Sequence, residues 1–441
     1  MNKKILIENV TIITMNKEKE IIENGILLIE NDEIKDVGSF EVKEKIEDFS
    51  NVDIIDGREG ILMPGMINCH THASMVPFRS LADDHKDRLK KYLFPLEQKL
   101  VDKDLVYKGA KYAISEMLLG GVTTFCDMYY FEDEVAKAAK EMKIRAVLCE
   151  TIVDFPSPDS KEPFGGLEYS KDFIRKWKGD NLITPGIAPH APYTNSNESL
   201  KEAFKISKDL EATLTMHVAE MDYEHEKYKK EYRLSPVKYL DSLGILDKDF
   251  ISAHTILVDE EDIEILKERE VKVVHNMGAN AKGAKGVANI LLMKEKGIDI
   301  GLGTDGPMSG NTLDIITQMS LVPKVHKLFS KDRSVLPAKE IVEMATMGGA
   351  RVLGKDKLIG SIEKGKKADL VILETESVNM QPIYDYYSTI VYSSNPSNVD
   401  TVIINGEIVV DNKKIVVDDF KKIRQDLIDM KNKIEEVAST L

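Results

Sequence analysis

Two histidines separated by one residue follow an apolar run that begins near Ile61. Alternate side chains of an extended chain point to the same side, so His70 and His72 would converge on one point past the end of a strand. Neutral imidazoles that converge in this way are usual ligands of a borderline cation such as zinc. A single His-x-His pair also occurs as a structural feature, so its meaning depends on what else lies at strand ends.

Three later apolar runs also end in a residue that can bind a metal or transfer a proton. These runs end at His217, with Glu220 just beyond it, at His254 and near Asp305. Three imidazoles and one carboxylate can hold a divalent ion while leaving a position for water. The expected metal ligands are His70, His72, His217 and Asp305. Water at such an ion becomes nucleophilic near neutral pH, because its pKa falls to about 7 at a favourable zinc site. The pattern predicts a metal-dependent hydrolase.

Three residues of this set could move protons. Glu220 follows His217 by three residues, so its carboxyl group could face a substrate above the ion and donate a proton to a ring nitrogen. His254 could polarise the attacking water, and Asp305 could accept its proton. The bland alternative for Glu220 is a surface carboxylate after a strand. A non-enzymatic metal-binding barrel would not require all three residues, which favours an enzyme.

The elements that must position these residues alternate between strand and helix over residues 59–360. Strands are predicted at 61–69, 122–127, 144–153, 182–189, 212–217, 249–254, 271–275 and 298–304. Helical patterns lie between most of them, for example at 104–119, 167–178, 199–210, 260–269 and 313–328. Eight strands followed by helices predict a (β/α)8 TIM barrel, an α/β fold whose active site lies at the carboxyl ends of the strands.

The two ends of the chain have a different sequence pattern from the middle. Residues 1–58 alternate short β-rich runs with charged turns, which is typical of an antiparallel sheet, and similar runs return after residue 361. We therefore expect a small β-sandwich domain built from residues 1–58 and 361–441, outside a barrel domain at 59–360. Apolar residues at helical spacing predict a terminal amphipathic helix over 418–438.

Composition and charge exclude several classes of partner. The formal net charge is −15, which argues against nucleic acid. No apolar stretch approaches the ~20 residues of a membrane span, and the first apolar run breaks at Glu8, too early for a signal peptide. Cys69, Cys126 and Cys149 lack Cys-x-x-Cys spacing, as expected for buried free thiols in a reducing compartment. The expected location is cytoplasmic, with no membrane partner.

Several motifs resemble those of the amidohydrolase superfamily, in the branch that includes methylthioadenosine/S-adenosylhomocysteine deaminases and chlorohydrolase-like enzymes. The matching segments extend over nearly the whole chain: 64–72, 121–124, 189–193, 217–220, His254, 275–276, 302–306 and 360–370. The resemblance implies a mononuclear zinc or iron site and hydrolytic loss of ammonia from an aromatic ring. Binuclear relatives carry a modified lysine at the end of strand four, where this chain has Pro189 and His190, so one ion is expected. Zinc is the first expectation, although this ligand set also accepts iron.

The resemblance also implies contacts with the substrate. Glu97 matches a glutamate that contacts ribose hydroxyls in adenosine-type deaminases, and His190 matches a histidine that contacts the substrate. The expected substrate is an aminopurine nucleoside of the adenosine, 5′-deoxyadenosine or methylthioadenosine type. Deamination of a free base, pterin or aminotriazine, and chloride displacement, stay open as alternatives. Chloride displacement needs less ring protonation, so Glu220 favours deamination. Related enzymes are often dimers or tetramers, which leaves a homo-oligomer open.

Departures from the family pattern bear on the substrate's tail. Arginines expected after strand three are replaced by Glu150 and Gly166, and Glu150 would repel the carboxylate of S-adenosylhomocysteine. That compound is therefore expected to be a poor substrate, with an uncharged or cationic tail preferred at Glu150. After strand seven, residues 275–283 lose the proline, serine and leucines that the family commonly has there.

The remaining histidines are given structural or surface roles. His275 is expected to support the metal shell through Asn276. His85 lies in a charged loop, for which a solvated loop is preferred to a lid. His225 and His326 lie among charged helical residues and are expected at the surface.

Overall fold

A computed structural model describes residues 3–46 and 48–441 and contains the predicted barrel. Eight strands form one sheet in the order of the sequence, and the printed pairings from β7 to β12 are parallel. The backbone N–H of Asp305 donates to the carbonyl of His70 at 3.0 Å, which links the segment after the last strand to the first. The strands are β5 (Met66–Thr71), β6 (Val122–Tyr129), β7 (Arg145–Ile152), β8 (Ile183–Pro189), β9 (Thr213–Val218), β10 (Phe250–His254), β11 (Lys272–His275) and β12 (Ile300–Leu302).

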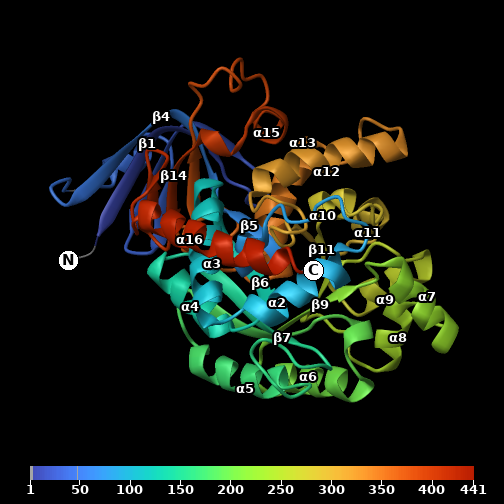
Figure 1. Cartoon of the computed structure of the whole chain (residues 1–441). Coiled ribbons are helices and arrows are strands. Elements are labelled where there is room, and N and C mark those ends of the chain that lie inside the picture. The colour runs from blue at the N-terminus through green and yellow to red at the C-terminus, as the bar shows by residue number, and fades with distance from the viewer. Residues whose placement is uncertain (1–2, 47) are drawn as a thin grey trace. The chain divides into compact units, whose positions relative to one another are not determined.

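Helices follow the barrel strands, as the apolar periodicity predicts. Figure 1 shows helices α4 to α9 on the outside of these strands. The longer helices are α2 (Phe94–Leu100), α3 (Lys103–Leu119), α4 (Glu132–Glu141), α5 (Gly166–Trp177), α6 (Asn197–Asp209), α7 (Asp222–Glu231), α8 (Pro236–Ser242), α9 (Glu260–Glu268), α12 (Ile315–Ser330) and α16 (Phe420–Ala438). Shorter ones are α10 (Met277–Lys282), α11 (Ile290–Glu295) and α13 (Ala338–Glu343). Helices α4, α5 and α6 contact the buried strands β7, β8 and β9 directly.

The first predicted strand was wrong in its extent. The run 61–69 is divided at Pro64 and Gly65 between β4 (Val52–Pro64) and β5, which belong to different sheets. Pro64 has no N–H to donate to a ladder. A Cβ on Gly65 would lie 2.0 Å from Oγ1 of Thr123, so only glycine fits at this crossing. An apolar run of this kind does not show in sequence where one sheet ends and the next begins.

Strands from both ends of the chain form a second sheet, as expected, in the order β16-β15-β14-β13-β4-β1-β2-β3. One pairing differs from the expected antiparallel pattern, since β1 and β4 run parallel. Ile7, Leu27 and Leu62 are fully buried in its core with Ile372 and Ile403. The bounds are β1 (Lys4–Ile13), β2 (Ile21–Glu30), β3 (Glu33–Gly38), β13 (Leu370–Leu373), β14 (Val399–Ile404), β15 (Glu407–Asp411) and β16 (Lys414–Ile415).

The chain forms two compact units. One contains the residues up to Asn68 together with Glu116–Thr124 and Asp314–Asp418, and the other contains Cys69–Ser115, Phe125–Leu313 and Asp419–Leu441. The terminal helix α16 thus lies in the barrel unit, where it contacts α2. The domain boundaries expected at 58/59 and 360/361 stay a prediction. Among the described residues, every helix is too short or too polar to cross a membrane.

The surface position expected for His326 was wrong. This residue lies on α12 and is only 3% exposed. Burial disfavours the charged imidazolium and lowers the pKa of His326 from 6.5 to about 4. Charged neighbours in the sequence concealed the position, because α12 turns one face inward while its other face carries the charges.

His326 should make folding stability depend on pH. The unfolded chain takes up this proton near pH 6.5 and the folded chain near pH 4, so the stabilisation is complete above pH 6.5 and is lost as the pH falls through this window. The loss should be on the order of 3 kcal/mol. Urea unfolding at pH 7.5, 5.5 and 4.5 should therefore show a shallower loss in His326→Gln than in the original chain. Equal losses in the two proteins would contradict the assignment.

Candidate active site

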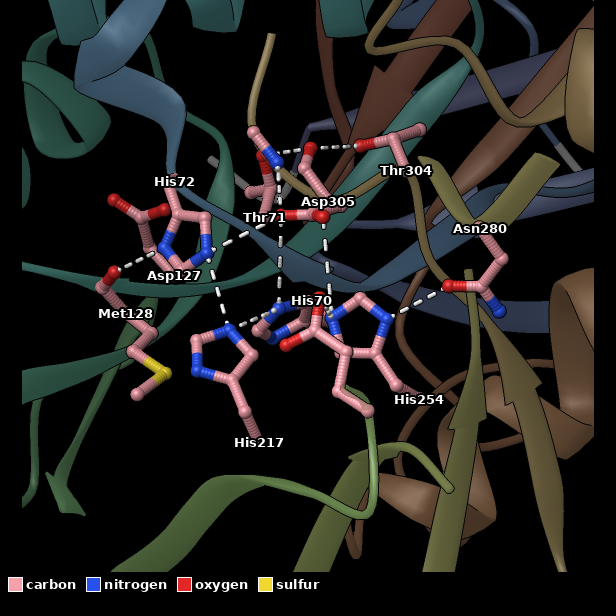
Figure 2. A network of polar contacts seen from close by, with 12 residues as sticks. His70, Thr71, His72, Asp127, Met128, His217, His254, Asn280, Thr304 and Asp305 are labelled. Carbon is pink, nitrogen blue, oxygen red and sulfur yellow. Dashed lines mark hydrogen bonds and ion pairs between the residues drawn. The ribbon is translucent and has the colours of Figure 1, made fainter. Parts of the chain in front are cut away.

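The barrel brings most of the predicted site residues together at the carboxyl ends of its strands. His70 lies in β5, His217 in β9 and His254 at the end of β10, while His72 and Asp305 lie just beyond β5 and β12. Figure 2 shows these four imidazoles and the carboxylate directed toward one another. Parallel strands of a barrel end at one face, so residues more than 200 positions apart in the sequence meet there.

Four of the side chains surround a common point. Nε2 of His217 lies 3.1 Å from Nε2 of His70 and 3.3 Å from Nε2 of His72. Oδ1 of Asp305 lies 3.2 Å from Nε2 of His72 and 4.0 Å from Nε2 of His70. Ligands bound to a tetrahedral ion at about 2.1 Å are separated by roughly 3.4 Å. The spacing of these donor atoms therefore fits the ligand shell of a divalent metal ion.

The protonation of the imidazoles also fits a metal site. Nδ1 of His72 donates to the carbonyl of Met128 at 2.5 Å, and Nδ1 of His217 donates to the carbonyl of His190 at 2.8 Å. When neutral, each of these two rings carries its lone pair on Nε2, facing the common point. Burial lowers the pKa of His70 and His217 well below the usual range, and their histidine neighbours lower it further. Neutral imidazoles with converging lone pairs repel one another unless a cation lies between them.

The four side chains around the common point, His70, His72, His217 and Asp305, form a metal cage. An ion pair between His72 and Asp305 holds one proton there. Burial lowers the pKa of His72, but the hydrogen bond and charge of Asp305 outweigh this effect and raise it to about 9. Burial would raise the pKa of Asp305, but the hydrogen bond from His72 and the charge of His254 hold it well below its usual range. A divalent ion would take the place of this proton, because ligand imidazoles bind in the neutral form.

Glu220 and His254 lie beside the cage. Nε2 of His254 is 3.6 Å from Oε1 of Glu220 and 3.8 Å from Oδ2 of Asp305. Nδ1 of His254 donates to Oδ1 of Asn280 at 2.8 Å, which directs Nε2 toward the two carboxylates. His254 and Asp305 have positive φ angles of 70° and 61°, in the left-handed region that few residues other than glycine adopt. Such strain at strand ends is typical of functional sites.

Asn280 and Lys285 are parts of this site that sequence reasoning missed. The amide of Asn280 holds His254, whereas the support of the metal shell by His275 through Asn276 stays a prediction. The ammonium group of Lys285 forms an ion pair with Oε1 of Glu220, and this lysine is largely buried. The only signal was the departure of residues 275–283 from the family pattern, which marked the segment but not the partners. A loop brings residues near a site without regular spacing.

A cavity of about 490 Å³ opens above the cage, and it includes two of the predicted substrate contacts. Glu97 and His190 both line it, as do Tyr129, Tyr193 and Phe155. Burial raises the pKa of Glu97 to about 7, although the hydroxyl of Tyr129 acts in the opposite direction. Burial and the charge of His72 lower the pKa of His190 to about 4. Aromatic walls with a few polar groups are typical of a pocket for a flat ring.

Glu150 is placed differently from the expectation. It is fully buried and is absent from the cavity lining, while its neighbour Thr151 is part of that lining. Oε2 of Glu150 accepts a hydrogen bond from the backbone N–H of Glu132 at 2.9 Å. Alternation along β7 explains the difference, because adjacent residues of a strand point to opposite sides. The predicted contact of Glu150 with a substrate tail therefore has no geometric support.

The charged segment around His85 borders the cavity, and Asp84, Lys86 and Asp87 in it are exposed, as expected for a solvated loop. Asp83 accepts hydrogen bonds from Lys282 and Asn311, each at 2.7 Å. Arg88 donates to the same carboxylate at 3.1 Å. The segment is therefore joined by an ion pair to Lys282, at the end of α10, and borders the cavity.

Comparisons with known proteins extend over the whole barrel and most of the second sheet. A sequence model of the amidohydrolase family matches residues 61–409. The 5-methylthioadenosine/S-adenosylhomocysteine deaminase of Thermodesulfovibrio yellowstonii is 40% identical over 413 residues, which is 93% of this chain and 94% of that protein. A deaminase of the same name from Thermoanaerobacter pseudethanolicus is 40% identical over 92% of this chain and 93% of its own length.

Solved structures agree with this relationship. An adenosine deaminase from Xanthomonas campestris with bound zinc superposes with a TM-score of 0.95 at 28% identity, over 98% of this chain and 99% of that one. A guanine deaminase from E. coli superposes with a TM-score of 0.82 at 22% identity, over 93% and 99% of the two chains, and supports the fold alone.

Proposed function

The chain belongs to the amidohydrolase family, and from this premise we propose that it hydrolytically releases ammonia from an aminopurine nucleoside of the adenosine, 5′-deoxyadenosine or methylthioadenosine type. One observation carries the proposal. A carboxyl group suited to proton transfer, Glu220, lies beside a cage of three histidines and Asp305 at the floor of a cavity with aromatic walls. Deamination of a ring requires two components: a nucleophile that attacks a ring carbon, and an acid that protonates the ring nitrogen next to that carbon.

We assign the metal ligands as His70, His72, His217 and Asp305, with zinc as the ion. Support comes from the separations of 3.1–4.0 Å between their donor atoms and from the orientation of the imidazole lone pairs. When bound, the ion supplies a hydroxide-like nucleophile near neutral pH and a positive charge at the floor of the pocket. The alternative group of His70, His217 and His254 leaves out Asp305, whose Oδ1 lies 3.2 Å from Nε2 of His72.

The acid and base roles follow from the neighbours of each group. Glu220 donates a proton to the ring nitrogen adjacent to the carbon that is attacked. Asp305 accepts the proton of the attacking water, and His254, held by Asn280, steadies both carboxylates from a distance of 3.6–3.8 Å. The proton on Asp305 then passes to the departing amino group, which leaves as ammonia. As the ring carbonyl forms, the hydroxyl proton of the addition intermediate returns to Glu220 and restores the acid. Each transfer is over a short distance within a buried site, so protons need not be exchanged with bulk water during the step.

Glu97 and His190 are the proposed contacts with the substrate. Both line the cavity, with Glu97 suited to accept hydrogen bonds from the two ribose hydroxyls. His190 lies next to the cage, its ring centroid 4.8 Å from that of His217. The buried free thiols Cys69, Cys126 and Cys149 support a reducing, cytoplasmic setting for this enzyme.

The proposal is tested by ammonia release from a small panel of substrates. The panel contains adenosine, 5′-deoxyadenosine, methylthioadenosine, S-adenosylhomocysteine, guanine, cytosine, a pterin and an aminotriazine. Zinc-loaded protein should act on the adenosine-type compounds, and Glu220→Gln should reduce kcat by ~10²-fold or more because acid catalysis is lost. The zinc content of that variant should be unchanged, since Glu220 is outside the assigned ligand set.

Other outcomes of the same panel would change the assignment. Activity confined to a free base, pterin or triazine would contradict the role of Glu97 as a ribose contact. Near-normal turnover by Glu220→Gln would remove this residue from the mechanism. Turnover of S-adenosylhomocysteine equal to that of methylthioadenosine would end the expectation of tail selection, which lost its geometric basis with the burial of Glu150.

Lys285 works against the acid role of Glu220 in the unliganded pocket. Burial would raise the pKa of Glu220, but the charges of His254 and Lys285 lower it below the usual range. Glu220 must nevertheless carry a proton to donate one. The ammonium group also occupies a hydrogen-bonding position on the carboxylate that a ring nitrogen requires. Substrate binding should therefore displace Lys285 from Glu220.

Removal of Lys285 should move the pH profile in one direction. Without this positive charge the pKa of Glu220 rises, so the protonated acid persists to higher pH. The alkaline limb of the pH profile of kcat/KM should therefore move to higher pH. Lys285→Met tests this, and Lys282→Met is the matched control on the same loop, since Lys282 binds Asp83 instead. An identical shift in both variants would show a general loss of charge rather than a specific effect on Glu220.

A further inference from the structure

The carboxyl group of Glu220 depends on an unusual backbone turn. Strand β9 ends at Val218, and Ala219 then adopts a φ of 52°, in the left-handed region that alanine rarely occupies. This conformation brings the next residue, Glu220, to the cavity lining. A strained turn persists only where its surroundings over-determine it, so the contacts of Ala219 and Glu220 decide where the acid lies.

Glu224 accepts hydrogen bonds from both backbone N–H groups of this turn. Oε1 accepts from the N–H of Ala219 at 3.0 Å, and Oε2 accepts from the N–H of Glu220 at 3.0 Å. The carboxylate thus uses both oxygens to hold two successive peptide groups. Glu224 lies in the first turn of α7, where the helix dipole favours a negative charge.

The opposite side of the turn is also held. The carbonyl of Ala219 accepts hydrogen bonds from the N–H groups of Ile256 and Leu257, at 3.0 and 2.9 Å. These contacts come from the chain that follows β10. The peptide groups around Ala219 are therefore fixed from two directions. Backbone N–H groups bind on one side, and the side chain of Glu224 binds on the other.

Burying the carboxylate of Glu224 to accept two hydrogen bonds is energetically unfavourable. It is fully buried, and within the described residues the structure shows no ion pair for it. Burial of a carboxylate without a cation is unfavourable, so stability alone does not explain its presence. Glu224 is absent from the cavity lining and does not touch the space that a substrate would occupy. Its hydrogen bonds are made instead with the backbone of Ala219 and Glu220.

We infer that Glu224 is a positioning residue that holds the turn of Ala219 and Glu220 so that the carboxyl group of Glu220 faces the reacting ring. The inference rests on the proposed role of Glu220 as proton donor. Because Glu224 acts through Glu220, its loss should reduce the chemical step and leave substrate and metal binding largely intact.

The test compares Glu224→Gln with Glu226→Gln, a matched control on the exposed side of the same helix. A glutamine offers only one acceptor oxygen, so one of the two N–H groups loses its partner. We expect kcat to fall by ~10–10²-fold, as for other small displacements of a catalytic group, with KM and zinc content close to those of the original chain. Glu226→Gln should resemble the original chain in all three respects.

A double-mutant cycle separates positioning from a structural role. Glu220→Gln/Glu224→Gln should be no slower than Glu220→Gln alone, because a misplaced acid costs nothing once the acid is gone. Independent, multiplying losses would overturn the inference, as would a lowered Tm with unchanged kcat. If Glu224→Gln does not fold, Glu224→Asp keeps the charge with one methylene less and should show the same loss of kcat.

Failure of the inference can be distinguished from failure of the proposed function. If the original chain and Glu226→Gln release no ammonia from the panel, the function fails. Crystal structures of zinc-loaded Glu224→Gln and Glu226→Gln then decide the inference without an assay. A displaced Glu220 turn in the first variant alone supports the inference, and an unchanged turn in both overturns it.

Discussion

The close approach of three imidazole nitrogens and one carboxylate is the constraint on which the rest of the site depends. Nε2 atoms of His70, His72 and His217 lie within 3.3 Å of a neighbouring ring nitrogen and face inward. Such an arrangement is unfavourable unless a cation lies at its centre. Two of the rings are held from behind, His72 by the carbonyl of Met128 and His217 by the carbonyl of His190. The barrel therefore stores repulsion that binding of a divalent ion relieves.

The acid beside this cage is held by weaker and more local means. Glu220 depends on a left-handed Ala219, on the carboxylate of Glu224 and on the chain after β10. Its free form is paired with Lys285, which a substrate must displace. The metal cage is thus determined by eight strands together, whereas the acid depends on one turn and one loop. This difference explains how one barrel can keep its metal chemistry while loops change the substrate.

Sequence reasoning predicted the parts of the site whose positions follow from the regular repeat of strands. Strand alternation and the shared face of parallel strands were enough to group His70, His217 and Asp305, although the first strand was extended past Pro64. It failed where a contact depends on side-chain direction or on loop geometry. Glu150 lies one residue from the cavity lining but points away, the contact of Asn280 with His254 was missed, and His326 turns inward from a charged helix. The period of a strand or helix does not by itself show which of its sides faces the interior, and the contact of Asn280 has no periodic signal in the sequence.

Anomalous X-ray diffraction from crystals of the zinc-loaded protein, recorded at the zinc absorption edge, tests the central claim most directly. The account predicts one strong peak per chain, within about 2.1 Å of Nε2 of His70, His72 and His217, and with Asp305 as the fourth ligand. A peak at His254 and Glu220 instead, or a second peak there, would contradict the division of the site into a metal cage and a proton-transfer pair. A crystal soaked in zinc with no peak at the three histidines would contradict the metal site itself.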